Sequence, residues 1–456
     1  MNKCRPRLRY VPKINLNVKG TAKPGLGDDR QHTFSYDARG HEETPHVVKF
    51  SGGRTSGLLL FMLLDNGMLK PERGDVVVFN NTTAEHPETY KFVAQCKKLV
   101  EEKYKVPFFW VEFQTYEDAR RGEWTRLPSY RMVHPYPYSK SEPYGYRSKG
   151  EAFEEMLSWS GYVPNQFQRT CTKNLKLETT KRFLQDWLSG QTGIARLGHY
   201  GESSRLKDDE MYARHKKHGG EVPKDIFLQK KAYVRSCPVF RPEQSFADYS
   251  SAAIVVPNGY SSHAHLGGNG FVEDGDAEYI SFIGLRKDEM QRVARVRQRN
   301  LEDVESDDHA GEYIYMPLSS MGIEKKDVDA FWVRQKWGLQ LSEDTSLSNC
   351  VYCFLKGAGG LQKVHAELSN GHSGVSKNGA LAHSPSDIRW WMQMESRYGR
   401  NIMAEGRKIR NKKKINIIGF FGNSNNFSYQ LLAKNGEGKA DISPYLDTVL
   451  PCDCTD

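Results

Sequence analysis

Three observations predict an α/β fold, with a doubly wound parallel sheet followed by a mainly helical C-terminal part that carries cysteines. Strand-length apolar runs alternate with helix-length segments between residues 46 and 113. A glycine-rich turn joins the first run to the first helix. From Asp327 onward helical periodicity dominates, next to a Cys-x-x-Cys pair. In such a fold we expect ligands beyond the carboxyl ends of the strands.

Hydrophobic patterning predicts the individual elements. The expected strands are the run that begins at His46 and residues 75–81, 106–113 and 279–285. One helix follows the glycine-rich turn, and further helices are expected at residues 88–104, 151–161, 172–189, 327–337, 357–368 and 386–398.

Composition divides the chain into four parts. Residues 1–45 read as a basic arm, rich in Gly, Pro and charge. Residues 46–300 form the α/β domain, and residues 202–276 within it are a polar, Gly-rich insertion. Residues 301–410 form the helical region with the Cys-x-x-Cys pair, and residues 411–456 form a weakly patterned C-terminal extension.

Length and composition exclude several classes of protein. A chain of 456 residues with 38% hydrophobic content can bury a sizeable core. No apolar stretch reaches the length of a membrane span, and the first residues lack the hydrophobic region of a secretory signal. We therefore expect a cytoplasmic protein with no membrane partner. Eight cysteines in such a chain do not indicate a disulfide framework.

A phosphate-binding turn is predicted between the first strand and the first helix. Gly52 and Gly53 allow the backbone to curl so that successive N–H groups converge. Hydroxyl groups on Ser51, Thr55 and Ser56 add donors, and the helix that follows points its positive end at the same place. The turn therefore suits an anion such as a nucleotide phosphate; the alternative is a strand-to-helix turn with no ligand.

This turn resembles the Ser-Gly-Gly-x-x-Ser PP-loop of the ATP pyrophosphatases and of the sulfonucleotide (PAPS) reductases. It matches neither Gly-x-x-x-x-Gly-Lys-Ser/Thr nor Gly-x-Gly-x-x-Gly. Four further motifs occur in family order: NNTTAEHPET from Asn80, RTCT from Arg169, GLRKDE from Gly284 and NCVYCFLKG from Asn349. The chain is therefore similar to PAPS reductase-like PP-loop proteins, nearest to the phage and DNA phosphorothioation (DndC/SspD-type) proteins. The resemblance implies an adenine nucleotide alpha-hydrolase-like fold.

The resemblance also assigns roles to individual residues. It implies nucleotide contacts from Ser51, Gly52, Gly53, Arg54, Thr55, Ser56, Asn81, Glu85, Arg169, Lys173, Gly284 and Arg286, and catalytic roles for Ser51, Arg54 and Arg286. A guanidinium at a strand end could stabilise a pyrophosphate leaving group, which is the role expected of Arg286; the alternative is a surface salt bridge to Asp288 or Glu289. Arg54 and Thr55 replace the Lys and Asp of the ATP-pyrophosphatase sequence, which removes a carboxylate that could assist Mg²⁺.

Four cysteines are candidate metal ligands. One close pair, Cys350 and Cys353, and two remote thiols, Cys171 and Cys237, could form a tetrahedral four-thiolate site. The resemblance favours a [4Fe–4S] cluster, because relatives carry one next to the nucleotide. Zinc is the alternative metal, and unrelated buried thiols are the alternative without metal. The tail cysteines Cys452 and Cys454 read as an ordinary tail, although such a pair could carry a persulfide.

The leading functional hypothesis is ATP-dependent adenylation in a sulfur-transfer system. ATP, with Mg²⁺, would activate an acceptor oxygen, and sulfur from a cysteine desulfurase or another donor would then replace that oxygen. The protein would act with sister modification proteins. With DNA as the acceptor, the product would be a phosphorothioate. One alternative is a sulfonucleotide (PAPS/APS) reductase. The other is a non-catalytic nucleotide-binding module with a structural metal.

A basic and aromatic segment suggests nucleic acid as a partner. Between Arg120 and Lys149, cations alternate with Trp124 and several tyrosines, a mixture that can hold phosphates and stack on bases. Charge reversal at Arg126, Arg131 and Lys140 is expected to weaken DNA binding if the segment lies beside the phosphate loop. The alternative is a solvated, Pro-rich loop.

Overall fold

The computed structural model describes residues 43–118, 125–190, 279–301, 312–335, 337–341, 347–369, 384–400, 418–423 and 427–445, with short pieces between residues 212 and 257. Most of the predicted N-terminal arm lies outside these residues, as do Trp124, Cys237, Cys452 and Cys454.

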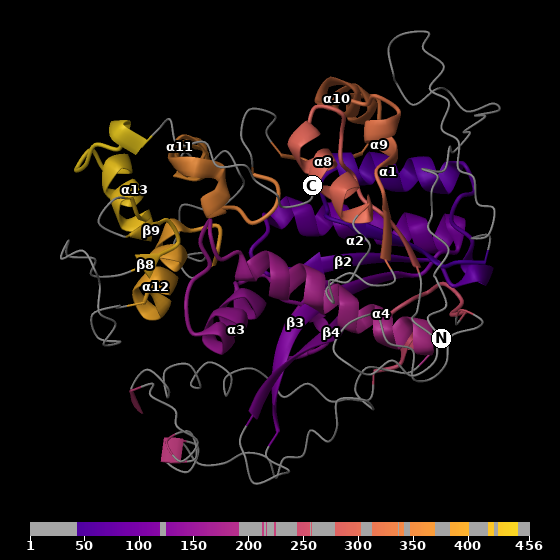
Figure 1. Ribbon diagram of the computed structural model, residues 1–456, viewed down its shortest axis with the longest axis horizontal. Coiled ribbons are helices and arrows are strands. Elements are labelled where there is room, and N and C mark those ends of the chain that lie inside the picture. Colours follow the sequence, from indigo (N-terminus) through magenta and orange to yellow (C-terminus); the bar gives the residue numbers. More distant parts are fainter. Residues whose placement is uncertain are drawn as a thin grey trace.

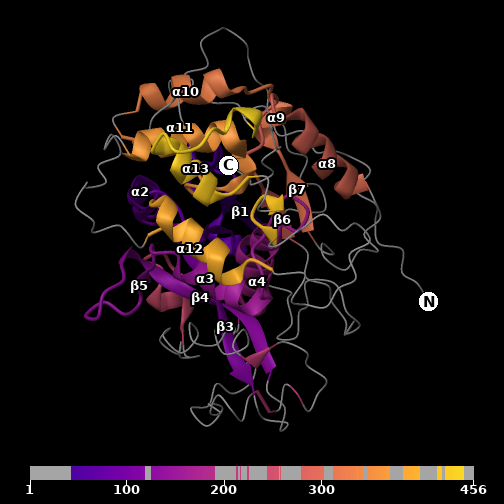
Figure 2. The ribbon, with the colours of Figure 1, turned by 90° about the vertical axis from the view of Figure 1, so that its left-hand side faces the viewer.

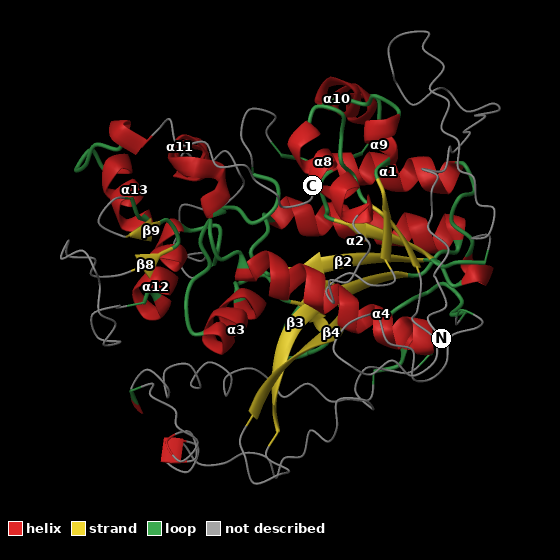
Figure 3. Ribbon diagram, in the orientation of Figure 1, coloured by secondary structure: helices red, strands yellow, loops and turns green. Residues whose placement is uncertain are grey.

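Seven strands form the main sheet (Figures 1 and 3), in the order β5-β4-β3-β2-β1-β6-β7. Their bounds are β1 His46–Phe50, β2 Val76–Asn81, β3 Phe108–Asp118, β4 Thr125–Pro137, β5 Gly145–Tyr146, β6 Tyr279–Phe282 and β7 Glu312–Tyr315. The pairs β1–β2, β2–β3, β1–β6 and β6–β7 are parallel, whereas β4 is antiparallel to β3. The predicted α/β class with a mainly parallel sheet is confirmed.

Strand order reverses at β1. The chain runs from β1 outward through β2 to β3, and then returns to place β6 and β7 on the other side of β1. The carboxyl ends of β1 and β6 therefore diverge into connections that leave in opposite directions, which opens a crevice between them. The glycine-rich turn after β1 stands at this switch point.

One face of the sheet is covered by helices α1 (Arg54–Asp65), α2 (Pro87–Tyr104), α9 (Pro317–Ser320) and α10 (Lys325–Val333). The core on this face joins Val48 and Phe50 of β1 to Leu58 of α1 and to the α10 side chain Trp332. Helix α4 (Thr179–Ser189) covers the other face, where Phe183 and Trp187 pack on Phe109. Helix α8 (Met290–Leu301) packs beside β7 through Val293 and Ile314.

A second core lies among helices of the C-terminal part, on the left of Figure 1 and facing the viewer in Figure 2. It comprises α3 (Glu151–Ser160), α11 (Gly357–Ser369), α12 (Ile388–Tyr398) and α13 (Tyr429–Gly436), with the small strands β8 (Ile418–Gly419) and β9 (Gly422–Asn423). Trp391, Phe420 and Tyr429 are fully buried at its centre, with ring centroids 5.3 to 5.5 Å apart. We call this the aromatic helical cluster.

Several elements differ from the sequence expectation. Strand β4 occupies much of the segment expected as a possible solvated loop, because its inward side chains Tyr130 and Met132 join the core under α4. Strand β7 lies in the region expected to be helical, and it pairs with β6. The helix expected at residues 172–189 is a π-helix, η2 (Thr172–Glu178), followed by α4. Long π-helical turns are rare and concentrate at functional sites.

Part of the predicted insertion also packs into the core. Phe246 and Tyr249 join the core under α4. The buried Lys97 ammonium donates to the Tyr249 carbonyl over 2.8 Å and to Glu101 over 2.6 Å. This network ties the insertion to α2.

Among the described residues, no helix combines the length and apolar character needed to cross a bilayer.

Candidate functional site

The turn after β1 has the geometry of an anion cradle. Gly52 adopts φ +80°, and a Cβ there would stand 2.9 Å from a Val93 methyl group, so only glycine fits. The Ser51 and Ser56 hydroxyls lie 2.8 Å apart, and the Gly53 N–H donates to Ser51 Oγ over 3.3 Å. Gly53 is the N-cap of α1, and no side chain caps this end. The first N–H groups of α1 are thus not taken up by a capping side chain.

Arg286 reaches this turn from the loop after β6. Its Nη1 donates to Thr55 Oγ1 over 2.8 Å, although the two residues are 231 positions apart in sequence. The guanidinium also lies 3.0 Å from Asp288, and the Arg286 N–H donates to Glu289. Arg286 therefore pairs with a local carboxylate, as the alternative interpretation predicts, and also contacts the Ser51–Ser56 turn, while its role toward a phosphate stays a prediction. Gly284 is buried in the same loop.

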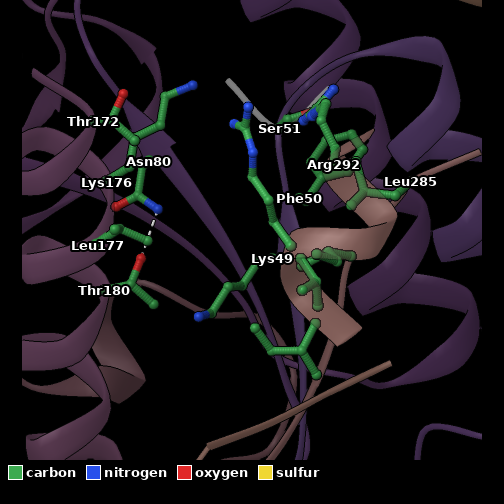
Figure 4. A pocket seen from close by; sticks show the side chains of 14 residues that line it. Lys49, Phe50, Ser51, Asn80, Thr172, Lys176, Leu177, Thr180, Leu285 and Arg292 are labelled. Atoms are coloured by element: carbon green, nitrogen blue, oxygen red, sulfur yellow. Dashed lines mark hydrogen bonds between the residues drawn. The ribbon is translucent and has the colours of Figure 1, made fainter. Parts of the chain in front are cut away.

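A cavity of about 240 Å³ opens beside the turn (Figure 4). It is bounded by strand ends from β1, β2 and β7, by the loop after β6, and by η2, α4 and α8. Its lining residues are Lys49, Phe50, Ser51, Asn80, Thr172, Lys176, Leu177, Thr180, Ile283, Leu285, Arg292, Arg295, Val296 and Ile314. The cavity thus occupies the switch point that the fold predicts as a ligand site.

The cavity is cationic. Lys49, Lys176, Arg292 and Arg295 line it, and no carboxylate belongs to its lining among the described residues. Lys49 pairs with Glu312 and Arg292 pairs with Glu289, so two of the cations are held in place by acids outside the lining. Six apolar side chains share the lining, and all of its charged side chains are cations, which favours an anionic ligand.

Asn80 and Thr172, which line the cavity, each carry a buried polar atom without a partner among the described residues. Asn80 Nδ2 donates to Thr180 Oγ1 over 2.7 Å, which fixes the orientation of the amide. The side-chain amide oxygen of Asn80 (Oδ1) and the Thr172 hydroxyl are buried and have no hydrogen-bond partner within the described part of the chain. Because buried polar atoms ordinarily find partners, these two atoms point to a polar ligand between β2 and η2.

Of the twelve predicted nucleotide contacts, only Ser51 belongs to the cavity lining. Three of the other eleven are engaged inside the protein. The Arg54 guanidinium donates to the carbonyl oxygens of Leu339 and Leu341, over 3.1 and 2.8 Å, and so holds the segment after α10. Asn81 is fully buried and donates to Glu112 Oε1 over 2.7 Å. Glu85 is 3% exposed and accepts from Thr82. In this structure all three support the turns around the site.

The π-helix and the residues before it present their cations differently from the sequence expectation. Lys173 is exposed and Arg169 is half-buried, and neither lines the cavity. Lys176 does line it, together with Thr172, one π-helical turn earlier. The Thr179 hydroxyl donates to the Asn174 carbonyl over 2.7 Å and stabilises this widened turn.

A second, smaller pocket of about 20 Å³ brings three of the predicted thiols together. Cys171, Cys350 and Cys353 all line it. The Cys353 N–H donates to the Cys350 carbonyl over 3.1 Å. The N–H of Val351, which follows Cys350, donates to the Ala84 carbonyl over 3.0 Å, so the Cys-x-x-Cys turn is bound to the loop after β2. Thr172 and Lys176 line both pockets. The thiols therefore adjoin the cationic cavity.

These thiols do not form a ligating group in this structure. Among the described residues, no set of three or more Cys, His, Asp or Glu side chains is close enough to hold a metal ion. Cys237, the fourth predicted ligand, lies outside the described residues. Three of the four predicted thiols therefore converge on one pocket, and the metal site stays a prediction.

The basic and aromatic segment requires a correction. Arg131 is 2% exposed, because its guanidinium points inward and pairs with the buried Glu112 carboxylate, with Nε 2.8 Å from Oε2. It is therefore not available to a polyanion. Strand β4 runs antiparallel to β3, so its last residues and the exposed Tyr136, Tyr138 and Tyr144 lie towards the opposite edge of the sheet from the phosphate turn. Lys140 is exposed there, and the Arg126 side chain lies outside the described residues.

Among the polar residues that line the cavity, Lys49, Thr180 and Arg295 belong to none of the motifs identified from the sequence. A signal existed for Lys49, since it is the one charged residue inside the apolar run of β1. The other two had none, because α4 and α8 are amphipathic helices whose polar residues do not reveal which of them face a cavity.

Searches of protein-family models, of curated proteins and of solved structures found no match to this chain.

Proposed function

We propose that this protein is an ATP pyrophosphatase that adenylates an acceptor oxygen in a sulfur-transfer system, with DNA as the acceptor. The observation that carries the proposal is the cationic cavity beside the Ser51–Ser56 turn. A nucleotide triphosphate matches its charge, its position at the switch point and the hydroxyl and N–H donors of the turn. The motif order that resembles PP-loop proteins supports the same assignment.

The proposed chemistry breaks the bond between the α and β phosphates of ATP. A non-bridging oxygen of a DNA phosphate attacks the α phosphorus, and pyrophosphate leaves. The terminal sulfur of a persulfide then attacks the DNA phosphorus and displaces AMP with that oxygen, and a thiol cleaves the remaining sulfur–sulfur bond to leave a phosphorothioate. Arg286 and Ser51 would stabilise charge on the leaving pyrophosphate. Mg²⁺ would be held chiefly by the phosphates, since no described carboxylate lines the cavity.

The thiol pocket supports a role for sulfur next to the nucleotide. We propose that Cys171, Cys350 and Cys353, with Cys237, hold a [4Fe–4S] cluster, or zinc as the alternative, after rearrangement of the pocket on loading. A cluster of this kind would supply electron transfer or a binding point for sulfur. The persulfide would come from a cysteine desulfurase or an equivalent donor.

A second candidate function is reduction of a sulfonucleotide such as PAPS. One observation favours it: the cavity lining offers cations but no carboxylate to share a magnesium ion, as suits a polyanion that binds without metal. A nucleotide-binding module with a structural metal and no turnover is the remaining alternative.

Product analysis tests the proposed function. The purified protein is incubated with [α-³²P]ATP and Mg²⁺, with and without DNA and a persulfide donor; labelled products are separated, and pyrophosphate is measured by a coupled assay. Pyrophosphate release and transfer of the label to DNA are expected when DNA is present, and free AMP is expected when the persulfide donor is also present. Release of sulfite from PAPS with a thiol reductant, and no pyrophosphate from ATP, would replace the proposal with the reductase. Binding of ATP with neither product would leave the non-catalytic module.

Two single substitutions test the site itself. Ser51→Ala and Arg286→Ala remove contacts at the phosphate turn without opening a core cavity, so ATP affinity or turnover should fall roughly 10- to 100-fold while the fold is kept. Lys287→Ala, at the neighbouring exposed cation, is the control and should match the parent. ATP binding and turnover equal to the parent in both site variants would contradict the assignment of this turn.

Metal content is tested by anaerobic purification followed by a visible spectrum and iron, zinc and sulfide analysis. We expect a brown protein whose colour is lost in Cys350→Ser and Cys353→Ser. A colourless parent with stoichiometric zinc would assign zinc to the site. A parent with neither metal would remove the metal from the proposal.

A further inference from the structure

Phe167 is the most exposed large apolar side chain in the described part of the chain. Its exposed fraction is 83%, compared with 75% for Val333 and 73% for Met290. A single exposed apolar side chain is common on protein surfaces, so exposure alone does not indicate a partner.

A rigid turn holds this ring outward. The buried Asn165 side chain accepts from the N–H groups of Phe167 and Gln168, over 2.9 and 3.0 Å. The backbones of Asn165 and Gln168 exchange two hydrogen bonds, of 3.1 and 3.2 Å. The turn therefore presents Phe167 at its tip in a fixed conformation, and binding a partner there would need little ordering.

The turn leads directly into the site. Cys171, which lines the thiol pocket, follows four residues after Phe167, and Thr172 and Lys176 of η2 line both pockets. Leu177, at the cavity, is 42% exposed, so the π-helix itself reaches the surface. A ligand seated on Phe167 would lie at the approach to the proposed reaction centre.

The segment of sequence that contains Phe167 is basic and polar. Residues 156–177 contain no Asp or Glu, whereas Arg169, Lys173 and Lys176 all follow the turn. The flanking residues of the ring are Gln166 and Gln168, so Phe167 is not part of a continuous apolar patch of the kind that docks a protein. A single exposed ring beside cations matches a base-stacking position on single-stranded nucleic acid.

We propose that Phe167 stacks on a base of single-stranded or locally unstacked DNA, while the exposed Lys173 holds a flanking phosphate. This deepens the proposed function and rests on it, because it assigns the surface that brings the acceptor phosphate to the cavity mouth. It also moves the nucleic-acid surface away from the Arg120–Lys149 segment.

Fluorescence anisotropy with a labelled 20-nucleotide single strand tests the proposal on the full chain. Stacking on one base predicts that Phe167→Ala weakens binding roughly 5- to 100-fold and that Phe167→Trp preserves it. Lys173→Gln should lower the slope of log Kd against log salt by about 0.7, as loss of one phosphate contact does. Tyr144→Ala, which removes a ring 51% exposed at the opposite edge of the sheet, is the matched control and should bind like the parent.

Equal DNA affinity of Phe167→Ala and the parent would overturn the proposal, as would an equal loss in Tyr144→Ala. Loss of binding to an acidic partner protein, with DNA affinity unchanged, would assign the ring to a protein interface instead. ATP cleavage by the parent is measured separately, as pyrophosphate release at a saturating concentration of DNA. If it fails while Phe167→Ala still loses DNA affinity, the adenylation chemistry falls and the stacking surface stands.

Discussion

The sheet and the aromatic helical cluster build their parts of the site in different ways. In the sheet, Lys49, Ser51 and Asn80 reach the cavity because parallel pairing brings strand ends to one edge. In the cluster, Cys350 and Cys353 are placed by packing that involves residues far later in the chain, such as Trp391. Local sequence motifs therefore predict the cavity at the strand ends more directly than they predict the thiol pocket.

The two regions also bury ionisable groups of opposite kinds. Burial lowers the pKa of His86, the N-cap residue of α2, to about 4. Burial raises the pKa of Glu395, on α12 in the cluster, to about 7. The sheet region is thus expected to lose stability as pH falls from about 6.5 to 4, and the cluster is expected to lose stability as pH rises from about 4.5 to 7. The following predictions probe that contrast.

Trp391→Ala should have the largest effect. Trp391 is fully buried between Phe420, Tyr429 and Trp390, and its Nε1–H donates to the Pro385 carbonyl over 2.8 Å. Its removal is expected to lower the free energy of unfolding by about 3–5 kcal/mol, measured by urea denaturation. The exposed Val333→Ala should change it by less than about 0.5 kcal/mol. A loss below about 1 kcal/mol in Trp391→Ala would mean that the cluster is not a packed core.

Glu395→Gln should remove a pH dependence from the cluster. The folded state keeps this proton up to about pH 7, whereas the unfolded chain releases it near 4.5, so the parent loses stability as pH rises through this window. The shift corresponds to about 3 kcal/mol, with no further loss above pH 7. The amide keeps an acceptor for the Phe420 N–H, which donates over 3.1 Å. Urea denaturation at several pH values should show a flatter profile and greater stability than the parent at pH 8; a parallel profile would refute the assignment.

His86→Asn should remove a loss of stability that occurs as pH falls, the opposite pH dependence to that of Glu395. The unfolded chain takes up this proton near pH 6.5 and the folded state only near 4, so the parent loses up to about 3 kcal/mol as pH falls through this window. Asparagine can still accept from the Glu88 N–H as an N-cap and does not titrate. The same denaturation series should show reduced acid sensitivity in the variant. Unchanged sensitivity would indicate that other groups govern acid unfolding.

A comparison of Arg295→Ala with Arg297→Ala has the smallest expected effect and is the most selective test. Both cations are exposed on α8, but only Arg295 lines the cavity. Loss of one charged contact predicts roughly 10-fold weaker ATP binding in Arg295→Ala, measured by calorimetry, and no change in Arg297→Ala. Equal effects in both variants would attribute ATP binding to the overall charge of α8 rather than to the cavity.

Local sequence determined much of this protein. The apolar runs at β1, β2 and β3, the Ser51–Ser56 turn and the start of α2 at Pro87 follow from hydrophobic period, glycine and capping chemistry within a few residues. Such signals depend only on neighbours along the chain, so these elements can be predicted without knowledge of the fold.

Tertiary structure decided which side chains meet. Arg286 reaches Thr55, Arg131 turns inward to Glu112, and Arg54 turns to the carbonyls after α10. Sheet register and helix packing set these long-range contacts, and side-chain charge alone does not indicate whether a cation faces a ligand, an acid or solvent. For that reason the sequence predicted the phosphate turn, while the cationic cavity and its shared wall with the thiol pocket emerged only from the folded chain.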